Sequence, residues 1–168
     1  MKLRLAIEKD LPEIISLFKA ITADLDSKGI NIWDEIYPAC AFPDDIKRES
    51  LFLLEEGKRI ISAFALCEPM EDEGSIVWYN PDAKGVYLFR FGVAPDCLNK
   101  GIGTYMLNEA ERIAKERGGD YLRLLVVDYN IPAISFYEKN GYRKAEGIYV
   151  KNQDGLILRE YGYEKNCT

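Results

Sequence analysis

The feature that most constrains the fold of this chain is a strand, a glycine loop, a helix and a second strand in direct succession. The segment Gly85–Val93 is rich in aromatic and β-branched residues, which predicts a central strand. After Gly101-Ile102-Gly103 a helix is expected as far as Arg117, and the nearly continuous apolar run Tyr121–Val127 predicts a buried strand. A strand, a helix and a parallel strand in this order form a right-handed crossover unit.

Further strands and helices are expected on both sides of this unit. Leu3, Leu5 and Ile7 alternate with polar residues as in a strand, and Asp10-Leu11-Pro12 then predicts a helix start. The remaining expected elements are a hairpin of 51–54 and 60–67, a short helix beginning near Asn130, and strands over 142–150 and 156–163. Together they predict an α+β fold with a mixed, largely antiparallel central sheet of about seven strands flanked by helices, in one domain spanning residues 1–168.

Composition excludes several classes of function. The 168 residues contain 22 basic and 28 acidic side chains, a formal charge of −6, so no basic surface for nucleic acid is expected. There is no histidine, which excludes a His base and a His-ligated metal. The four cysteines are widely spaced without a CxxC pair, and no apolar run approaches bilayer length. We therefore expect a cytoplasmic protein with reduced thiols, no metal and no membrane segment.

The loop Asn99-Lys100-Gly101-Ile102-Gly103-Thr104 lies between a strand and a helix start, where free backbone N–H groups and the positive helix end bind phosphate. The GxxxxGK[ST] pattern is absent, and Met106 occupies the third glycine position of the dinucleotide pattern GxGxxG. Hydrolysis of a nucleoside triphosphate and a Rossmann cofactor are thus not supported. The alternative interpretation of the loop is a glycine turn that only starts a helix.

Three separated segments resemble the acetyl-CoA-binding motifs of the GNAT superfamily of N-acetyltransferases. They are Phe89-Arg90-Phe91-Gly92-Val93-Ala94-Pro95, then Gly101-Ile102-Gly103, then Asn130-Ile131-Pro132-Ala133-Ile134-Ser135-Phe136-Tyr137 with Asn140-Gly141-Tyr142. Their order and spacing match, and the resemblance covers nearly the whole chain and implies the GNAT-like fold. One position departs from the family pattern, because Leu98 stands where Gln or Arg is usual.

The resemblance implies acetyl-CoA as co-substrate and a set of residues that bind it. The backbone of Phe91, Gly92 and Val93 would pair with the pantetheine arm as a strand does. The residues Asn99, Lys100, Gly101, Ile102, Gly103 and Thr104 would hold the pyrophosphate. Asn130 would contact the pantetheine, cap its own helix, or do both.

Tyr137 occupies the position where many family members place the general acid that protonates the departing CoA thiolate. A phenol with an ordinary pKa of about 10 stays protonated at neutral pH, as such a donor requires. The alternative role of Tyr137 is that of an aromatic core residue. The amine also needs a base or a water chain, and the candidates are carboxylates at Asp34, Glu35, Glu68, Glu71 and Glu73. Cys97 has no activating base and is expected to be a bystander.

The segment Asp24–Pro43 is expected to form a lid or a bent helix pair, since Gly29 and two prolines interrupt its pattern. In the resembled family this region covers the acceptor site, so Trp33, Asp34 and Tyr37 would line the amine pocket. Aromatic rings beside a carboxylate suit a cation. Packing of Trp33 on the sheet edge is the alternative.

The resulting hypothesis is an N-acetyltransferase that moves an acetyl group from acetyl-CoA to a primary amine of a small molecule by direct attack in a ternary complex. One alternative is a noncatalytic acyl-CoA-binding or sensing domain, and another is acetylation of a protein N-terminus or lysine. Expected partners are a small amine and no nucleic acid or membrane, and a homodimer is compatible with the sequence.

Overall fold

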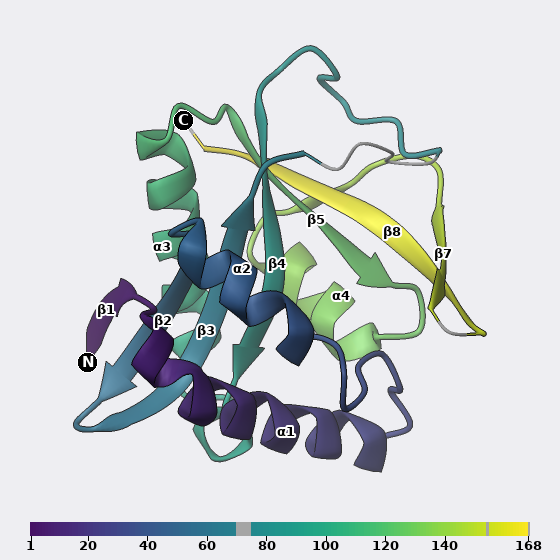
Figure 1. The fold of residues 1–168 in the computed structure, drawn as a ribbon. Coiled ribbons are helices and arrows are strands. Elements are labelled where there is room, and N and C mark those ends of the chain that lie inside the picture. The colour runs from purple at the N-terminus through teal and green to yellow at the C-terminus, as the bar shows by residue number, and fades with distance from the viewer. Residues whose placement is uncertain (70–74, 154, 168) are drawn as a thin grey trace. The chain divides into compact units, whose positions relative to one another are not determined.

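The computed structural model describes residues 1–69, 75–153 and 155–167 (Figure 1). They contain eight strands and four α-helices, and fall into two compact units. The first unit comprises Met1–Leu66 and Phe89–Ala110, and the second comprises Cys67–Leu88 and Glu111–Thr168. Strand β4 (Gly85–Val93) and helix α3 (Ile102–Glu116) each contribute residues to both units.

The first unit begins with an antiparallel arrangement of strands and two helices. Strand β1 (Lys2–Leu5) pairs with β2 (Leu51–Glu56), and β2 pairs with β3 (Arg59–Cys67). The second half of β4 lies beside β3, where Ala94 N–H donates to Ile61 O at 2.8 Å. Helices α1 (Leu11–Ser27) and α2 (Phe42–Lys47) follow β1 in the sequence. The expected strand, helix and hairpin are therefore present.

Helix α1 packs an apolar face against strand β4. Ile14, Leu17, Phe18 and Ile21 are buried, and a Cβ on Gly92 would lie 2.6 Å from Ile21 Cδ1. Glycine at position 92 thus lets the helix approach the strand closely. The carboxylate of Asp10 does not cap α1, because it accepts hydrogen bonds from Arg4 and from the amide of Ile7 instead.

The second unit contains the parallel part of the sheet. The first half of β4 pairs with β5 (Tyr121–Val127) in parallel from Gly85–Tyr121 to Tyr87–Arg123. On its other side β5 pairs antiparallel with β8 (Leu156–Asn166), which also pairs with β6 (Arg143–Lys144) and β7 (Tyr149–Gln153). Helix α4 (Ile131–Lys139) follows β5, and its Glu138 accepts a hydrogen bond from the Tyr163 hydroxyl at 2.8 Å.

One expected strand is divided in the structure. Residues 142–150 form β6 and the start of β7 instead of a single strand, because Gly147 interrupts them with a φ of 84°. A Cβ at Gly147 would lie 1.9 Å from Ser75 O, so only glycine fits against the neighbouring segment. Residues 76–79 contribute a single bridge, between Val77 and Glu146.

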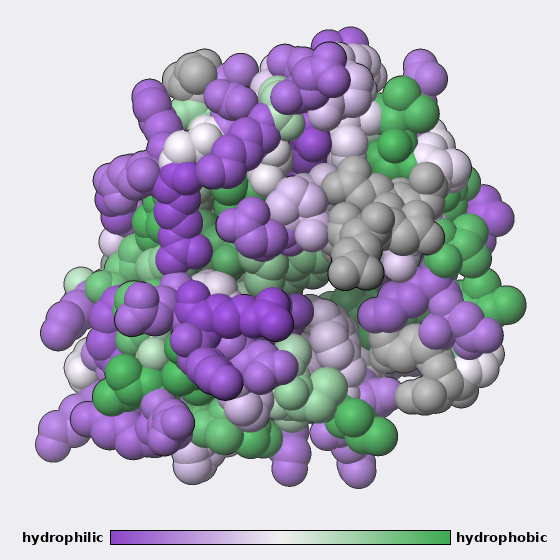
Figure 2. Space-filling model, turned by 45° about the horizontal axis from the view of Figure 1, so that its top comes forward, coloured by the Kyte–Doolittle hydropathy of each residue, from purple (hydrophilic) through white to green (hydrophobic). Residues whose placement is uncertain are grey.

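The sheet is mixed, since the β4–β5 ladder is parallel while the β1–β2, β2–β3 and three β8 ladders are antiparallel. The predicted α+β class with a mixed, largely antiparallel sheet is confirmed, with eight strands among the described residues instead of about seven. Hydrophilic residues cover much of the face seen in Figure 2. In the described ranges no helix has the length and apolar character needed to cross a membrane.

Candidate active site

The glycine loop and the start of α3 present backbone amides to open space. Asn99 and Gly101 have positive φ angles of 60° and 78°, and the stretch from Leu98 to Gly101 is exposed. The first α-helical bond of α3 runs from Tyr105 N–H to Gly101 O at 3.0 Å. The amides of Ile102, Gly103 and Thr104 therefore precede the first N–H that has an acceptor within the helix, and they are its N-terminal donors. A Cβ on Gly101 would have no atom within 4 Å.

A helix start of this kind attracts anions, because its first N–H groups and the positive end of the helix dipole point the same way. The loop predicted to bind phosphate lies at the start of this 15-residue helix. Leu98, which stands where the family usually has Gln or Arg, lies beside this loop and is 39% exposed. Its apolar side chain therefore does not cover the amides. Cys97 is buried and carries no sign of a reactive thiol.

The strand before the loop is irregular just before the residues that the resemblance assigns to the pantetheine arm. Arg90 has a positive φ of 50°, which breaks the extended conformation of β4 just before Phe91. Gly92 O accepts from Ser62 Oγ at 2.7 Å, and Ala94 N–H donates to β3. Because backbone groups alternate in direction along a strand, those of Phe91 and Val93 point to the opposite edge.

A buried ion pair holds Arg90. Its Nε and Nη2 donate to the two carboxylate oxygens of Asp45 in α2 at 2.6 and 2.7 Å, and its Nη1 donates to the Tyr37 hydroxyl at 3.4 Å. The Arg90 and Asp45 side chains are only 10% and 7% exposed. Burial raises the pKa of Asp45 and outweighs the lowering effect of the Arg90 guanidinium. The pair therefore connects the irregular part of β4 to α2 and to Tyr37.

The proposed acceptor residues share one segment of the first unit. Trp33 is half-buried, and its ring centroid lies 5.4 Å from that of Phe18, so it packs on α1. The Asp34 carboxylate accepts from the amides of Ile36 and Tyr37 at 2.8 and 2.7 Å. Asp34 thus stabilises the turn that carries Tyr37. The segment is a loop that follows α1 and leads into α2.

Helix α4 of the second unit carries Asn130 and Tyr137. The Asn130 side chain accepts from Ala133 N–H at 3.3 Å, which establishes its capping role. Tyr137 is 8% exposed, and its ring lies 5.4 Å from Phe136 and 5.8 Å from Tyr142. Burial raises the pKa of the Tyr137 hydroxyl. The tyrosine therefore stays protonated at neutral pH.

The Tyr137 hydroxyl has the properties of an available proton donor. Within the described ranges the Tyr137 hydroxyl makes no hydrogen bond. Every side-chain oxygen there that is fully sealed from solvent has a hydrogen-bond partner. The hydroxyl oxygen is therefore not completely sealed from solvent, although the side chain is buried. Tyr142, by contrast, donates to Glu111 Oε1 at 3.0 Å and is engaged.

The candidate bases differ in what the structure gives them. Glu68 and Glu35 are exposed, Asp34 is used in its turn, and Glu71 and Glu73 lie outside the described residues. No group of three or more cysteines and carboxylates in the described part of the chain is placed to hold a metal ion. Sequence reasoning missed the buried pair of Arg90 and Asp45, because these two residues lie 45 positions apart in the chain.

Comparison with known proteins identifies the family. The family model described as "Acetyltransferase (GNAT) family" matches residues 18–142. The chain is 31% identical over 121 residues to the uncharacterized protein YxbD of Bacillus subtilis, covering 64% of this chain and 74% of that protein. It is 37% identical over 78 residues to the spermidine N(1)-acetyltransferase of Thermoplasma acidophilum, covering 46% of this chain and 45% of that enzyme.

The fold agrees with this assignment. The crystal structure of a GNAT-family acetyltransferase from Streptococcus agalactiae superposes with a TM-score of 0.80 at 17% identity, covering 98% of this chain and 94% of that one. The GNAT-like fold expected from the sequence is thereby confirmed. Because the family model spans most of the chain, the protein belongs to the GNAT family of acetyltransferases.

Proposed function

We propose that this protein transfers the acetyl group of acetyl-CoA to a primary amine of a small molecule by direct attack in a ternary complex. The observation that carries the proposal is the start of α3, where the amides of Ile102, Gly103 and Thr104 face open space after a loop with two positive φ angles. Enzymes of this family use acetyl-CoA as co-substrate. We propose further that residues 1–168 act as one acetyltransferase domain in the cytoplasm, where its four free cysteines would stay reduced.

The pyrophosphate of acetyl-CoA would bind the backbone of Asn99 to Thr104, with Lys100 adding a positive charge. The pantetheine arm would extend along Phe91–Val93 and accept and donate backbone hydrogen bonds there. Asn130 would add a contact beyond its capping role. Since Leu98 cannot donate a hydrogen bond, the backbone would supply most of the phosphate affinity.

In the reaction the amine nitrogen attacks the thioester carbonyl carbon, forming the C–N bond as the carbonyl π electrons move to oxygen. A strand amide near Phe91 would stabilise that oxygen. The C–S bond then breaks, the amine nitrogen loses its proton, and the CoA sulfur gains one. The products are the N-acetyl amine and CoA with a free thiol.

Tyr137 would supply the hydrogen bond and the proton to the departing sulfur. A CoA-like thiol has a pKa of about 8.5, well below that of a buried tyrosine. The raised pKa of Tyr137 keeps the donor protonated and favours stabilisation of the thiolate by a hydrogen bond before the proton moves. The amine proton would leave to water or to a carboxylate such as Glu68 or Glu35. Trp33, Asp34 and Tyr37 would line the amine side.

Calorimetric titration with acetyl-CoA and release of CoA thiol across a panel of amines and polyamines test the proposal. We expect saturable binding and turnover of at least one amine.

The role of Tyr137 is tested by substitution. Tyr137→Phe should lower kcat about a hundredfold while leaving acetyl-CoA affinity nearly unchanged. Tyr142→Phe, an aromatic neighbour already bonded to Glu111, is the matched control and should keep most of kcat. Absence of acetyl-CoA binding at millimolar concentration would contradict the proposal, and binding without turnover of any amine would favour a sensing domain.

The phosphate loop can be tested separately. Gly101→Ala forces an alanine into a positive φ of 78° and should weaken acetyl-CoA binding about tenfold. Lys100→Ala leaves the backbone unchanged and should cost only a few-fold, as an exposed charge does. Equal losses in the two variants would mean that side-chain charge, not the backbone, holds the pyrophosphate.

A further inference from the structure

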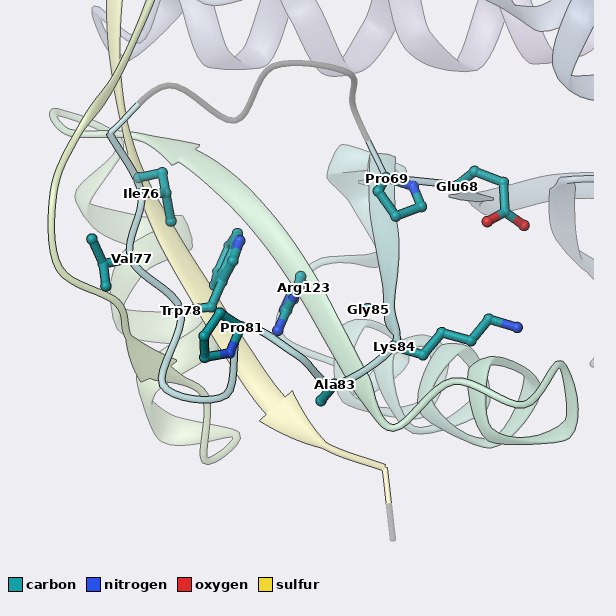
Figure 3. Close-up of a pocket in the computed structure, with 10 residues that line it drawn as sticks. All are labelled: Glu68, Pro69, Ile76, Val77, Trp78, Pro81, Ala83, Lys84, Gly85 and Arg123. Atoms are coloured by element: carbon teal, nitrogen blue, oxygen red, sulfur yellow. The ribbon is translucent and has the colours of Figure 1, made fainter.

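A pocket of about 430 Å³ lies within the second unit, between the segment that follows β3 and the start of strands β4 and β5 (Figure 3). Its walls are largely apolar and include Ile76, Trp78 and Pro81. Such a volume accommodates a molecule of about a dozen non-hydrogen atoms. None of the residues assigned above to acetyl-CoA binding lines it.

The buried charged group at the wall of this pocket is Arg123 of β5, which stands between Trp78 and Gly85 in Figure 3. Its side chain is 5% exposed. Nε donates to Glu164 Oε2 at 3.1 Å, and Nη2 donates to Asn80 O at 2.7 Å. The guanidinium carbon lies 4.8 Å from the centre of the Trp78 ring.

The third guanidinium nitrogen, Nη1, has no acceptor among residues 1–69, 75–153 and 155–167. In the same ranges every side-chain nitrogen that is sealed from solvent has a hydrogen-bond partner. Since Nη1 has none, it must reach open space. For a side chain that is otherwise buried, the space available is the pocket that it lines. Nη1 is therefore a cationic donor directed at a cavity.

The surroundings hold this donor in place. Glu164 is 2% exposed and accepts from Tyr79 N–H at 2.7 Å, which fixes the carboxylate that orients Arg123. A Cβ on Gly85 would lie 2.8 Å from Arg123 Cδ and 2.9 Å from Nη1, so glycine leaves the space that the guanidinium occupies. A donor fixed on three sides loses little entropy when it binds an acceptor.

The charges around the pocket select the kind of acceptor. A guanidinium N–H binds a carboxylate more strongly than a neutral carbonyl. Lys84 adds a second positive charge only at longer range, since its Nζ donates to Arg117 O at 3.2 Å and points away from Arg123 (Figure 3). Glu164 behind Arg123 and Glu68 at the rim oppose a dianion such as a phosphate monoester. The Trp78 ring and its apolar neighbours suit a flat or branched hydrocarbon body. These properties together favour a small monocarboxylate.

We propose that this pocket binds the carboxylate of a small organic molecule, with Arg123 Nη1 as its donor and Trp78 as the wall for its apolar part. The site is separate in its residues from the proposed acetyl-CoA site. The carboxylate can belong to the amine that is acetylated or to a different ligand, and the experiments below distinguish these sources.

Calorimetric titration of the whole chain without acetyl-CoA tests the site directly. The probes are 3-phenylpropanoate and its uncharged analogue 3-phenylpropanamide. We expect the carboxylate to bind at least about tenfold more tightly than the amide, as a charge-assisted hydrogen bond requires. Equal affinities, or no binding of the carboxylate at millimolar concentration, would overturn the proposal whether or not acetyl-CoA binds.

Two variants keep the test independent of folding. Arg123→Lys retains the charge beside Glu164 but removes the extra donor, and it should weaken 3-phenylpropanoate about tenfold. Ala83→Leu adds bulk at a half-buried lining position without touching the ion pair, and it should also weaken binding.

A second pair of variants tests the surrounding charge. Lys84→Met should lower the affinity for 3-phenylpropanoate a few-fold, whereas Lys115→Met, on the exposed face of α3, should leave it unchanged. Undiminished binding in both Arg123→Lys and Ala83→Leu would contradict the assignment.

The source of the carboxylate is distinguished by acetylation of phenylalanine and phenethylamine, which differ only in that group. This comparison rests on the proposed function. If the ligand is the acceptor, phenylalanine should have a KM at least about tenfold lower, and Arg123→Lys should raise that KM with little change in kcat. Equal KM values, together with binding of 3-phenylpropanoate, would assign the pocket to a separate carboxylate ligand and support the site itself.

Discussion

Each unit of this protein contains a buried arginine paired with a carboxylate, and the two pairs differ in how much of the arginine they use. In the first unit Arg90 donates through two nitrogens to both oxygens of Asp45. In the second unit Arg123 donates only Nε to Glu164, whose other oxygen accepts from Tyr79. The Arg90–Asp45 pair is called closed, because both oxygens of the carboxylate accept from the arginine. The Arg123–Glu164 pair is called open, because it leaves a donor nitrogen of Arg123 for another molecule. Burial of an ion pair alone therefore does not distinguish a structural arginine from a binding one.

The elements that carry the partners explain this difference. Asp45 projects from helix α2 and accepts with both oxygens from the Nε and Nη2 edge of Arg90. Glu164 lies on β8, directly opposite Arg123 in the antiparallel register. One oxygen of Glu164 accepts from Arg123 Nε, while the other accepts from Tyr79 N–H. The competing bond from Tyr79 thus limits Glu164 to one nitrogen of the guanidinium.

The largest expected effect is that of opening the closed pair. Asp45→Asn leaves Arg90 buried without an anion, and it should lower the free energy of unfolding by about 3 kcal/mol. Urea denaturation followed by circular dichroism measures the loss. Asp44→Asn, at the exposed neighbouring position of α2, is the matched control and should change stability by less than about 0.5 kcal/mol. A loss at Asp45 no larger than that of the control would mean that burial already cancels the ion pair.

The open pair should tolerate the equivalent change better. Glu164→Gln keeps an oxygen for Tyr79 N–H, and Arg123 retains Asn80 O and the open pocket. The free energy of unfolding should fall by about 1 to 2 kcal/mol, less than for Asp45→Asn. The same urea experiment compares the two variants. If Glu164→Gln proves the more damaging, the distinction between a closed and an open pair is wrong.

A third, partly exposed pair should give a smaller effect that depends on pH. Arg4 donates to both oxygens of Asp10 and to Glu55, and its hydrogen bonds to Asp10 lower the pKa of that carboxyl group. A carboxyl group whose pKa is lower in the folded state stabilises the fold above its unfolded pKa of about 4 and loses that contribution as pH falls. Asp10→Asn should therefore cost up to about 1 kcal/mol at pH 7.

The cost of Asp10→Asn should shrink toward pH 3, where the wild-type carboxyl group becomes protonated. Thermal unfolding at several pH values between 3 and 7 would follow it. Glu8→Gln, an exposed carboxylate two residues earlier, is the control and should show no such dependence. A cost that is constant with pH would mean that Asp10 acts by shape and not by charge.

Local patterns in the sequence were sufficient for the loop and its helix. Gly101 with a positive φ, the end of α3 before Gly118, and the Asn130 cap all follow from rules that involve a few neighbouring residues. Proximity along the chain makes such features predictable. Tyr137 was placed by family resemblance, and its buried ring agrees with both the donor and the core alternatives.

Features that depend on long-range register were not predictable in this way. The Arg123–Glu164 pair joins residues 41 positions apart, and the Arg90–Asp45 pair joins residues 45 positions apart. Neither pairing has a local signal, since an arginine in a strand pattern resembles any solvent-facing residue. The positive φ of Arg90 also has no signal in the sequence, because the residue that usually indicates such an angle is glycine. Its conformation is held by tertiary contacts with Asp45 and Tyr37.

The smallest effect is expected for a pair that also has two hydrogen bonds of similar length but is exposed, and whose carboxylate meets the Nη1 and Nη2 edge of the arginine instead of the Nε edge. Arg59 donates from Nη1 and Nη2 to the two oxygens of Asp96 at 2.6 and 2.7 Å, and the side chains are 55% and 60% exposed. The guanidinium lowers the pKa of Asp96 to about 2. Any stabilisation would thus be present above pH 4 and lost toward pH 2, and salt would screen it.

Asp96→Asn should leave the urea midpoint unchanged at physiological ionic strength, with a small decrease appearing only in low salt at neutral pH. Asp82→Asn, an exposed carboxylate outside any ion pair named above, provides the baseline at each ionic strength. A loss at Asp96 comparable to that of Asp45→Asn would show that two-pronged geometry alone stabilises such pairs. A null result would assign the difference to burial, because the two pairs have nearly the same donor–acceptor distances.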